Sequence, residues 1–383
     1  MDLTLSDEQQ SFRTMMRSFL DAEVVPHRQA WDRAEQVDLG LLPKMAELGF
    51  FGLGVPEEYG GVGGDTLTYA LAMEELGRAD SAVRGIVSVS LGLVGKSILS
   101  FGSEEQKAQW LPRITSAQSL ACFGLTEPDT GSDAGNLTSK AVREGDDYVI
   151  SGRKMFITNG TWADVCLVFA RTGGPGPKGV SAFLVPTDSE GFEALEVKGK
   201  LGLRGQATAE IVLDRVRVPA SAMLGEEGQG FRIAMTALDK GRVGIGASCV
   251  GIVQGCLEET VKYTTQRRQF GKPIASFQLV QDMIADMSVD ADAARLLVWR
   301  AADLADRGEK FSIAASKAKL FASEAAVRAA NLAIQCFGGY GYVDEYPVQK
   351  YLRDARVMTL YEGTSQIQKL IIGRDETGIN AFG

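Results

Sequence analysis

Hydrophobic and polar positions along the chain change their period twice. Up to about residue 117, apolar side chains recur every three or four residues, which indicates amphipathic helices. From about 118 to 226, short β-branched runs alternate with turn residues, and from about 227 the helical spacing returns. The pattern predicts a mainly α-helical protein with an inserted β domain, made of an N-terminal helical domain (1–117), a middle β domain (118–226) and a C-terminal helical bundle (227–383).

The N-terminal part is expected to hold three main amphipathic segments. Ser6 with Gln9 has the spacing of a capping box, so a helix should begin directly after Ser6. The glycine-rich run at 60–64 should break the chain before the third segment. The apolar stripes of the three segments lie at Phe12, Met16, Phe19 and Leu20, at Leu41, Leu42, Met45 and Leu48, and at Tyr69, Met73 and Leu76.

Short runs in the middle part have the composition of β-strands, and the C-terminal part favours long helices. The runs are 148–150, 165–169, 181–185 and 211–213, and the Gly/Pro-rich stretch 173–178 separates two of them. Helical spacing then recurs at Val250, Val253, Leu257 and Val261. An alanine-rich stretch, 312–335, should end at a C-cap formed by Gly338 and Gly339. Four long helices with short links predict a bundle.

Length and composition narrow the class of protein. With 383 residues, 45% of them hydrophobic and 23% charged, the chain is expected to be soluble and globular, with two or three domains. The net charge of −9 argues against nucleic acid or an anionic membrane surface as a partner. No apolar run approaches the ~18 residues of a membrane span. The acidic N-terminus, from Met1 to Glu8, lacks the pattern of a targeting peptide.

The cysteines and the single histidine limit the chemistry that the chain can perform. Five cysteines, scattered and never in a C-x-x-C pair, fit a reducing cytoplasm and give no support to a disulfide framework or a zinc site. His27 alone cannot form a multi-histidine metal site, and it is expected at the surface. No metal site is therefore expected, and acid–base chemistry must rest on carboxylates, lysines or tyrosines.

Glu362, within the tetrapeptide Tyr-Glu-Gly-Thr at 361–364, is a candidate for that chemistry. A carboxylate partly desolvated beside an aromatic residue has its pKa raised towards neutrality, as a general base requires. Gly363 would let a ligand approach the backbone. Ser365 and Gln368 have the spacing of a capping box. The helix that follows carries an apolar stripe at Ile367, Leu370 and Ile371. The alternative is an ordinary glutamate ahead of a helix N-cap.

Two further segments, 123–133 and 154–160, offer polar and aromatic groups to a cofactor. The first has small and hydroxyl residues whose donors suit a polar ring edge and a phosphate. The second has Phe156, which can stack on a flat ring, and a hydroxyl at Thr158. The sequence has neither a G-x-G-x-x-G after a strand nor a P-loop, so a redox cofactor would be held in another way. The alternative is that both segments are turns between strands.

Together with residues 359–374, these segments resemble the signatures of the acyl-CoA dehydrogenase family, and the resemblance runs through nearly the whole chain. It implies the family's three-part fold, FAD as cofactor and α,β-dehydrogenation of an acyl-CoA. Glu362 would take the pro-R α-proton while the β-hydrogen leaves as hydride to flavin N5. The Glu362 backbone N–H and a ribityl hydroxyl would polarise the thioester carbonyl. Some relatives place the base at the position of Gly241, which cannot act.

The resemblance assigns the FAD contacts residue by residue. Phe123, Leu125 and Thr126 would lie against the isoalloxazine edge, and Ser132 would reach the pyrophosphate and the acyl-CoA. Phe156 would stack on the flavin where many relatives carry Trp, and Thr158 would approach N5. A neighbouring subunit's FAD pyrophosphate would be clasped by Arg267, Gln269 and Phe270, with Gln278 in the same element. Adenosine would meet Gln335, Gly338 and Gly339, and the site would be completed by Thr364 and Gln366.

The same resemblance implies the substrate contacts. Tyr361 and Gly363 would flank the base, and the CoA moiety would meet Asp239 and Arg242, one helical turn apart. By pattern alone, that last pair is a surface ion pair.

Arg84 and Ser88, four residues apart on one helical face, resemble the glutaryl-CoA dehydrogenase branch, in which an Arg and a Ser bind the distal carboxylate of a dicarboxylyl-CoA. The C-terminal run 377–382 is also similar to that branch. The alternative is that Arg84 faces solvent or pairs with Asp80. The expected substrate is therefore a dicarboxylyl-CoA of glutaryl or adipyl type, with a short-chain, butyryl-type thioester as the alternative.

Several partners and rival activities follow from the family resemblance. Electron transfer flavoprotein is the expected electron acceptor, and the protein is expected to be a cytoplasmic homotetramer, since the Arg267 segment should serve a neighbour's FAD. An enoyl-CoA reductase or an acyl-CoA oxidase would share the same motifs. A non-catalytic helical scaffold is the alternative from another class, and loss of Glu362 or of the Ser132 segment would mark it. Both are intact.

Overall fold

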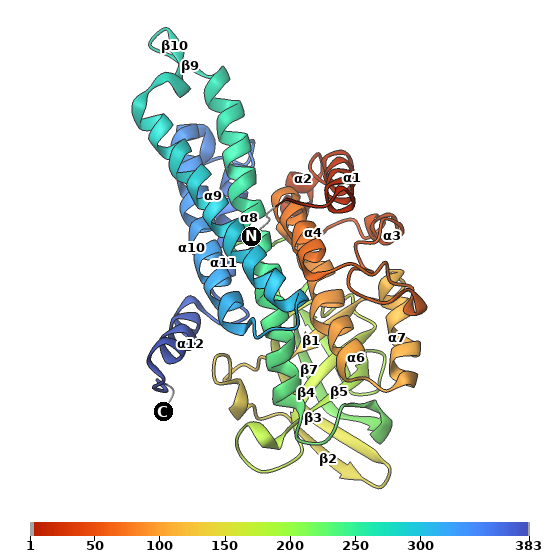
Figure 1. Cartoon of the computed structure of the whole chain (residues 1–383). Coiled ribbons are helices and arrows are strands. Elements are labelled where there is room, and N and C mark those ends of the chain that lie inside the picture. The colour runs from red at the N-terminus through yellow and green to blue at the C-terminus, as the bar shows by residue number, and fades with distance from the viewer. Residues whose placement is uncertain (1–3, 382–383) are drawn as a thin grey trace.

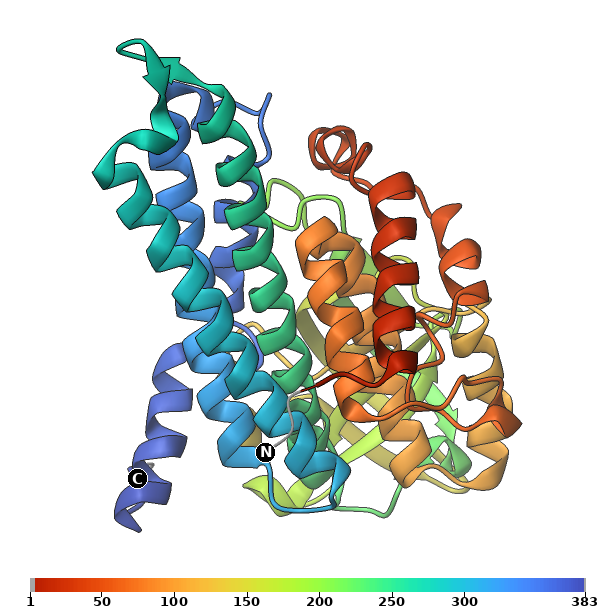
Figure 2. The ribbon, with the colours of Figure 1, turned by 45° about the horizontal axis from the view of Figure 1, so that its top comes forward.

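The computed structural model describes residues 4–381, so the first three residues of the acidic N-terminus and Phe382, the last residue of the C-terminal match, lie outside it. The long C-terminal helices run from a small hairpin at one end to the β-strands at the other (Figure 1). The N-terminal helices lie beside this bundle and over the strands (Figure 2). The predicted mixed architecture, helical with a β domain in the middle, is present.

The N-terminal part is helical, and its stripes pack as expected. The capping box of Ser6 and Gln9 is formed, Met16 and Leu20 are fully buried, and His27 is exposed. The helices are α1 (Asp7–Glu23), α2 (Arg28–Ala34), α3 (Leu41–Glu47), α4 (Thr66–Ala79), α5 (Ser81–Val87), α6 (Lys96–Phe101) and α7 (Glu104–Thr115), with a π-helical segment, η2 (Ser88–Gly95), between α5 and α6.

The stretch Ser81–Phe101 corrects one expectation. It forms 21 residues of helix with a mean hydropathy of 1.5, long and apolar enough by composition to cross a membrane. However, 83% of the 18-residue part over which this hydropathy is averaged is buried inside the protein. The stretch is therefore a core element of the fold. It was overlooked as an apolar run because Arg84, Ser88 and Ser90 interrupt it.

The eight strands of the middle part form one mixed sheet. They are β1 (Ala121–Gly124), β2 (Lys140–Glu144), β3 (Asp147–Thr158), β4 (Val165–Arg171), β5 (Val180–Pro186), β6 (Phe192–Glu196), β7 (Thr208–Pro219) and β8 (Met223–Leu224). Their order is β6-β7-β3-β2-β4-β5-β8, with β1 parallel to β4. The four predicted runs lie inside β3, β4, β5 and β7. The exact domain limits remain a prediction.

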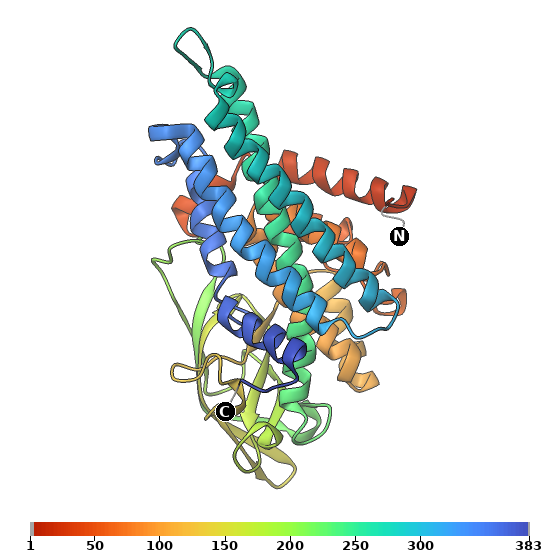
Figure 3. The same ribbon diagram turned by 60° about the vertical axis from the view of Figure 1, so that its left-hand side comes forward.

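The C-terminal part contains three long helices rather than four. They run side by side (Figure 3): α8 (Gly230–Gln266), α9 (Gln278–Asp306) and α10 (Ser312–Phe337). The hairpin β9 (Arg268–Gln269) and β10 (Lys272–Pro273) joins α8 to α9, and the shorter α11 (Val348–Met358) and α12 (Ser365–Thr377) follow. As predicted, α10 ends at Gly338, which has a positive φ of 60°. In place of a fourth long helix the structure has the two shorter helices α11 and α12, separated by the loop Thr359–Thr364 that the sequence predicted ahead of the last helix.

Two contacts fix the N-terminal helices against the bundle. Where α4 crosses α8, a Cβ added at Gly77 would lie 2.2 Å from the Ser248 carbonyl oxygen, and one added at Gly251 would lie 1.9 Å from that of Glu74. The two backbones therefore touch, and no larger residue fits at either glycine.

The second contact is a buried ion cluster. Lys350 of α11 has its Nζ 3.0 Å from Asp80 and 2.7 Å from Asp354. Asp80 caps α5 by accepting from Ala82 N, and Asp354 accepts from Leu203 N in the middle domain at 2.7 Å. One lysine thus joins groups from all three parts of the chain. It sets α5 relative to α11 and to the loop that follows α11.

Candidate active site

Glu362 lies in the loop between α11 and α12, in a conformation that few residues adopt. Its φ is +53°, and that of Gly363 is +90°, so both lie in the left-handed region that costs free energy for a non-glycine residue. The N-cap of α12 is Thr364, whose hydroxyl accepts from Ile367 N. The predicted capping box on Ser365 is wrong: the Ser365 hydroxyl donates instead to a carboxylate of α10.

The strained loop is held by three side chains from three helices. Gln368 of α12 donates to the carbonyl oxygens of Glu362 (3.2 Å) and Gly363 (3.0 Å). Lys319 of α10 donates to the Gly363 carbonyl at 2.8 Å, and Arg242 of α8 reaches the Glu362 carbonyl at 3.4 Å. These bonds hold the carbonyls of Glu362 and Gly363 in place and stabilise the unusual backbone of the loop.

The Glu362 carboxyl group is buried and incompletely paired. Its Oε2 has no hydrogen-bond partner within residues 4–381. Burial raises the pKa of Glu362 to about 7, against the opposing effect of Arg84, Lys319 and Arg242. The raised pKa that the tetrapeptide predicted is therefore present. Oε2 lies where a Cβ at Gly241 would be only 2.2 Å away, so this glycine of α8 makes room for the carboxyl group.

Arg84 is one of the largest fully enclosed side chains of the protein. It is 2% exposed, and its guanidinium donates to Ser88 Oγ at 2.9 Å, to the Tyr361 hydroxyl and to Met358 Sδ. Its Nε has no partner, and no carboxylate of the described chain lies within ion-pair distance of it. The alternative that Arg84 faces solvent or pairs with Asp80 is wrong, because Asp80 pairs with Lys350.

The pair Asp239 and Arg242 is formed, with 2.6 Å between Oδ1 and Nη1. Arg242 is buried, and the second Asp239 oxygen accepts from the Ser312 hydroxyl. The pair is thus not an exposed surface ion pair. It lies next to the loop of Glu362, and its proposed contact with CoA remains a prediction.

A small apolar cluster, separate from the main core, lies close to these polar groups. Val89 and Leu93 of η2 pack with Ala237 of α8, and Phe123 of β1 packs against them. Leu93 also lies near Gly241, on the side where the Glu362 carboxyl group is placed. The carboxyl group therefore has an apolar wall beside it.

The two segments predicted to meet the flavin ring lie side by side in the sheet region. Met155 N donates to Thr126 O at 2.8 Å, and the buried pair Lys154 and Glu127, 2.8 Å apart, joins the same two segments. Glu127 also accepts from the backbone N–H of Thr138 and Ser139. The Lys154 ammonium group, with a smaller contribution from these bonds, lowers the pKa of Glu127 to about 2 against the opposing effect of burial. The buried side chains of Lys154 and Glu127 therefore both have partners, and they hold the two segments together.

The predicted flavin contacts on these segments differ in exposure. Phe156 is 65% exposed with a φ of +60°, so its ring stands out from the sheet on a strained backbone. Phe123 and Thr126 are half-buried, Leu125 is buried and Ser132 is exposed.

Thr158 is half-buried, and its hydroxyl oxygen accepts from Gln206 Nε2 at 3.3 Å. Gln206 was not foreseen as a site residue. Its Oε1 packs against Gly85 of α5, where a Cβ would lie 1.8 Å away. Because an amide N–H occupies the Thr158 oxygen, the hydroxyl proton is left free to be donated elsewhere.

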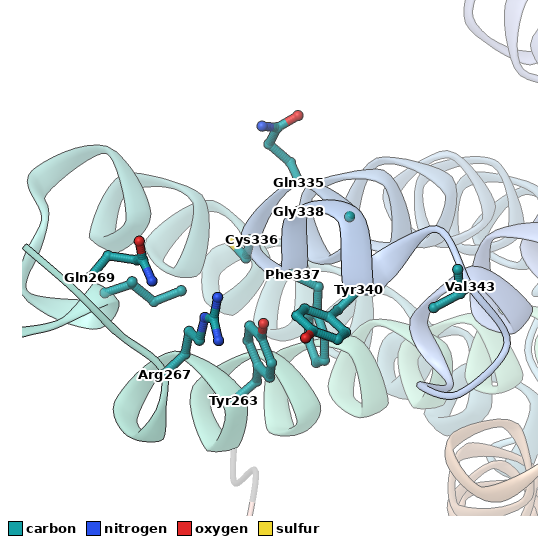
Figure 4. Close-up of a pocket in the computed structure, with 11 residues that line it drawn as sticks. Tyr263, Arg267, Gln269, Gln335, Cys336, Phe337, Gly338, Tyr340 and Val343 are labelled. Atoms are coloured by element: carbon teal, nitrogen blue, oxygen red, sulfur yellow. The ribbon is translucent and has the colours of Figure 1, made fainter.

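A pocket of about 550 Å³ lies at the other end of the bundle, away from Glu362 (Figure 4). Arg267, Gln269 and Gln335 line it, together with Gly338 and Gly339. Aromatic rings form one wall, since Tyr263 and Phe337 stack at 4.0 Å between ring centroids and the Arg267 guanidinium lies over Tyr340.

The structure does not bring all the predicted FAD residues together. The pocket lined by Arg267 lies beside the β9–β10 hairpin, far from the strands of the middle domain (Figure 1). Phe270, at the tip of that hairpin, is 92% exposed and has a φ of +51°. Gln278 opens α9 and is not part of the hairpin, which corrects the expectation that it shares an element with Arg267. Gln366 is exposed on the first turn of α12, next to the Glu362 loop.

Comparisons with known proteins agree with this arrangement. Family models described as acyl-CoA dehydrogenase N-terminal, middle and C-terminal domains match residues 6–118, 122–216 and 228–376. The chain belongs to the acyl-CoA dehydrogenase family. It is 45% identical to an acyl-CoA dehydrogenase of Bacillus subtilis, over 97% of this chain and 98% of that protein.

Solved structures of the family superpose closely on the whole chain. Butyryl-CoA dehydrogenase from Megasphaera elsdenii has a TM-score of 0.96 at 40% identity, covering 98% of this chain and 100% of that one. Glutaryl-CoA dehydrogenase from Mycobacterium smegmatis has a TM-score of 0.95 at 38% identity, covering 99% and 97%. The predicted acyl-CoA dehydrogenase fold and the prediction of an oxidoreductase of this family are confirmed. Relatives of both substrate types match almost equally well.

The residues of this acyl-CoA dehydrogenase family member that sequence reasoning missed are mostly charged or amide groups in apolar surroundings. Lys319 stands among buried alanines of α10, and Lys154 is itself fully buried in β3. A lysine at a buried helical or strand position is itself a signal, since burial of an ammonium group requires a partner. Residues 4–381 contain no cluster of His, Cys, Asp or Glu able to hold a metal ion.

Proposed function

We propose that the protein is an FAD-dependent acyl-CoA dehydrogenase in which Glu362 removes the α-proton of an acyl-CoA thioester. The observation that carries this is the Glu362 carboxyl group itself: buried, with an unpaired Oε2 and a pKa of about 7. A base with such a pKa is ionised in a large fraction of molecules at neutral pH and still accepts a proton readily. The left-handed backbone is clamped through the carbonyls of Glu362 and Gly363, and the Glu362 backbone N–H would donate to the thioester oxygen.

FAD, when bound, supplies the acceptor for the β-hydrogen. The residues present fit this group, because the exposed Phe156 ring offers a stacking face and the half-buried Thr158 hydroxyl has a proton to donate. Phe123, Leu125 and Thr126 would border the ring, and Ser132 would meet the pyrophosphate. Thr364 and Gln366 would lie at the same site from the Glu362 side.

We propose a dicarboxylyl-CoA, of glutaryl or adipyl type, as substrate. Arg84 is a buried guanidinium with an unpaired Nε, and a buried cation without a carboxylate partner is costly in the free protein. A distal carboxylate of the acyl chain would satisfy it, with Ser88 as a second donor. Because Arg84 contacts Tyr361, the neighbour of Glu362, the acyl chain between thioester and carboxylate must be short.

The experiment compares kcat/KM for glutaryl-, adipyl- and butyryl-CoA in the wild type and in Arg84→Met. The dicarboxylyl proposal expects a wild-type preference for glutaryl- or adipyl-CoA that falls by about 100-fold in the variant, the effect of losing a charge-assisted hydrogen bond pair. A wild-type preference for butyryl-CoA that the variant leaves unchanged contradicts it.

The butyryl-type alternative rests on a different use of the same residue. Arg84 opposes the rise in the pKa of Glu362, so its charge would serve the base rather than the substrate. Under that reading Arg84→Met lowers the rates for all three thioesters by the same factor. Use as an enoyl-CoA reductase or an oxidase is tested by anaerobic assay with and without an electron transfer flavoprotein, the acceptor that we propose.

We also propose a cytoplasmic homotetramer whose domains meet near residues 117/118 and 226/227. The pocket lined by Arg267 lies away from the chain's own flavin segments, so it would serve the FAD of a neighbour. The exposed apolar side chains of α9, Leu279, Val289 and Leu296, support an interface there. Light scattering of the purified protein measures the mass, and a monomer that retains FAD contradicts the shared site.

A further inference from the structure

Lys319 occupies a position where a charged residue is unexpected. It is fully buried in α10, and Ala315, Ala318 and Ala322 around it on the helix are also fully buried. Removing an ammonium group from water is costly unless strong partners replace the water. Such a lysine therefore has a structural or chemical reason to be there.

The contacts of Lys319 point to the Glu362 loop. Its Nζ donates to the Gly363 carbonyl at 2.8 Å, and no Asp or Glu of residues 4–381 lies within ion-pair distance of it. The carboxylates whose charge it feels are Glu362 and Glu324, while the neighbouring Cys249 thiol stays neutral because burial raises its pKa to about 12. Its charge is thus not matched by a salt bridge, and it is directed at the loop that carries the proposed base.

We propose that Lys319 is a positioning residue for Glu362: its hydrogen bond fixes the peptide that follows the base, and its positive charge favours the carboxylate form. The proposal rests on the proposed function of Glu362. It assigns to Lys319 two separable effects, one of geometry and one of charge.

The groups that face Glu362 come from every element packed around it. Arg84 of α5, Arg242 of α8 and Lys319 of α10 favour its ionised form. Tyr69 of α4 and Tyr361 of the loop stay neutral near pH 7, because burial raises the pKa of both phenols. Among the three cations, Lys319 alone titrates near neutrality, since burial lowers its pKa to about 8.

Gln368 provides the matched control, because it donates to the same Gly363 carbonyl without a charge. Lys319→Met removes both the hydrogen bond and the charge, whereas Gln368→Met removes only hydrogen bonds. Lys319→Arg keeps a charge and donors at the position. The three variants therefore separate the two effects.

The experiment measures kcat/KM against pH for the FAD-loaded protein, with the most active thioester of the panel. In Lys319→Met the acid limb should move up by about one pH unit, which lowers the ionised fraction of Glu362 at pH 7 about fivefold. Above pH 9 that part of the loss should disappear, and only the pH-independent loss caused by the missing hydrogen bond should remain. In Gln368→Met the rate should fall at every pH while the acid limb stays in place. Lys319→Arg should return the acid limb to its wild-type position.

Two outcomes overturn the proposal. One is an unchanged acid limb in a Lys319→Met protein that keeps its FAD, and the other is the same shift in Gln368→Met. If Lys319→Met does not fold, Lys319→Gln, which keeps a donor, replaces it with the same expectation for the acid limb. Failure of the proposed function is distinguished by Glu362→Gln: if that variant stays active, the base is elsewhere and the assignment of Lys319 falls with it.

Discussion

The two ends of the C-terminal bundle differ in how complete they are. Around Glu362, groups from α5, α8, α10 and α12 surround one carboxyl group and its loop, and the backbone carbonyls of Glu362 and Gly363 both have donors. Around Arg267, the donors and aromatic rings line an open pocket and face nothing else in the chain's described part. The first end holds chemistry that one chain can organise by itself. For the groups of the second end we propose a role in binding a ligand.

This difference predicts different consequences of substitution at each end. Changes near Glu362 should act on the rate and its pH dependence, because charges and close packing dominate there. Changes near Arg267 should act on cofactor affinity and assembly, because exposed groups gain their energy only on binding. Each of the following measurements tests this expected difference between the two ends.

The largest effect is expected for Glu362→Gln. The amide retains the shape of the side chain but cannot accept the α-proton, so kcat should fall by about 10²–10⁴-fold or more. FAD content, measured from the flavin absorbance of the purified protein, should stay at the wild-type level. Loss of activity that follows only from loss of FAD would remove the contrast between the two ends.

Gly241→Ala comes next. A methyl group at this position would lie 2.2 Å from Glu362 Oε2, so the carboxyl group must move, and overpacking of this kind costs ~1–3 kcal/mol. If that cost falls on the transition state, kcat/KM drops by about 10–100-fold.

The matched control is Gly373→Ala in α12, where an added Cβ meets nothing within 4 Å. It should leave kcat/KM within about twofold of the wild type, since exposed helix positions tolerate alanine. Equal losses in the two variants would show that the assay reports folding and not the position of the base.

Arg267→Ala should have a smaller effect of a different kind. Loss of a guanidinium that meets a phosphate or stacks on an aromatic ring should weaken FAD binding by about tenfold. The apparent Kd, from titration of FAD into the apoprotein, checks this. With saturating FAD, kcat should equal that of the wild type. A lowered kcat at saturation would place Arg267 in the chemistry and contradict the contrast.

The smallest effect concerns stability against pH. The pKa of Glu362 is near 4.5 when unfolded and about 7 when folded, so between these values the folded state binds more protons. Stability should therefore fall as the pH rises from about 4.5 to 7. Glu362→Gln should abolish this slope and stabilise the protein at pH 8 by ~1–3 kcal/mol. Urea unfolding at pH 5 and pH 8 measures it, and an identical slope in both proteins would argue against the raised pKa.

Much of the fold could be predicted because local patterns determine it. The stripe of Met16 and Leu20, the strand runs and the cap at Gly338 depend on residues near one another in sequence. Glu362 could be found for the same reason, since its aromatic and glycine neighbours are adjacent. The loop at Glu362 and the helix after it were predicted from the same local pattern, but the positive φ of Glu362 was not, because a glutamate gives no local sign of a left-handed backbone.

The contacts that were missed join residues far apart in the chain. Ser365 has the spacing of an N-cap, but its hydroxyl bonds to Glu324, and Thr364 takes the cap. Gln206 reaches Thr158 across the sheet, and Lys319 reaches Gly363 from another helix. No local rule predicts which of several polar residues will meet, because the tertiary arrangement decides it.

The ion cluster at Lys350 has a consequence for how substrate length is measured. It lies outside the site, yet it joins the cap of the helix that carries Arg84 to the helix that leads to Glu362. Together with the touching backbones of α4 and α8, it holds the Arg84 guanidinium and the Glu362 carboxyl group at a fixed separation. If Arg84 binds the far end of the substrate, replacing Arg84 should change which acyl length is preferred. Disrupting the Lys350 cluster should instead weaken the preference for any one length.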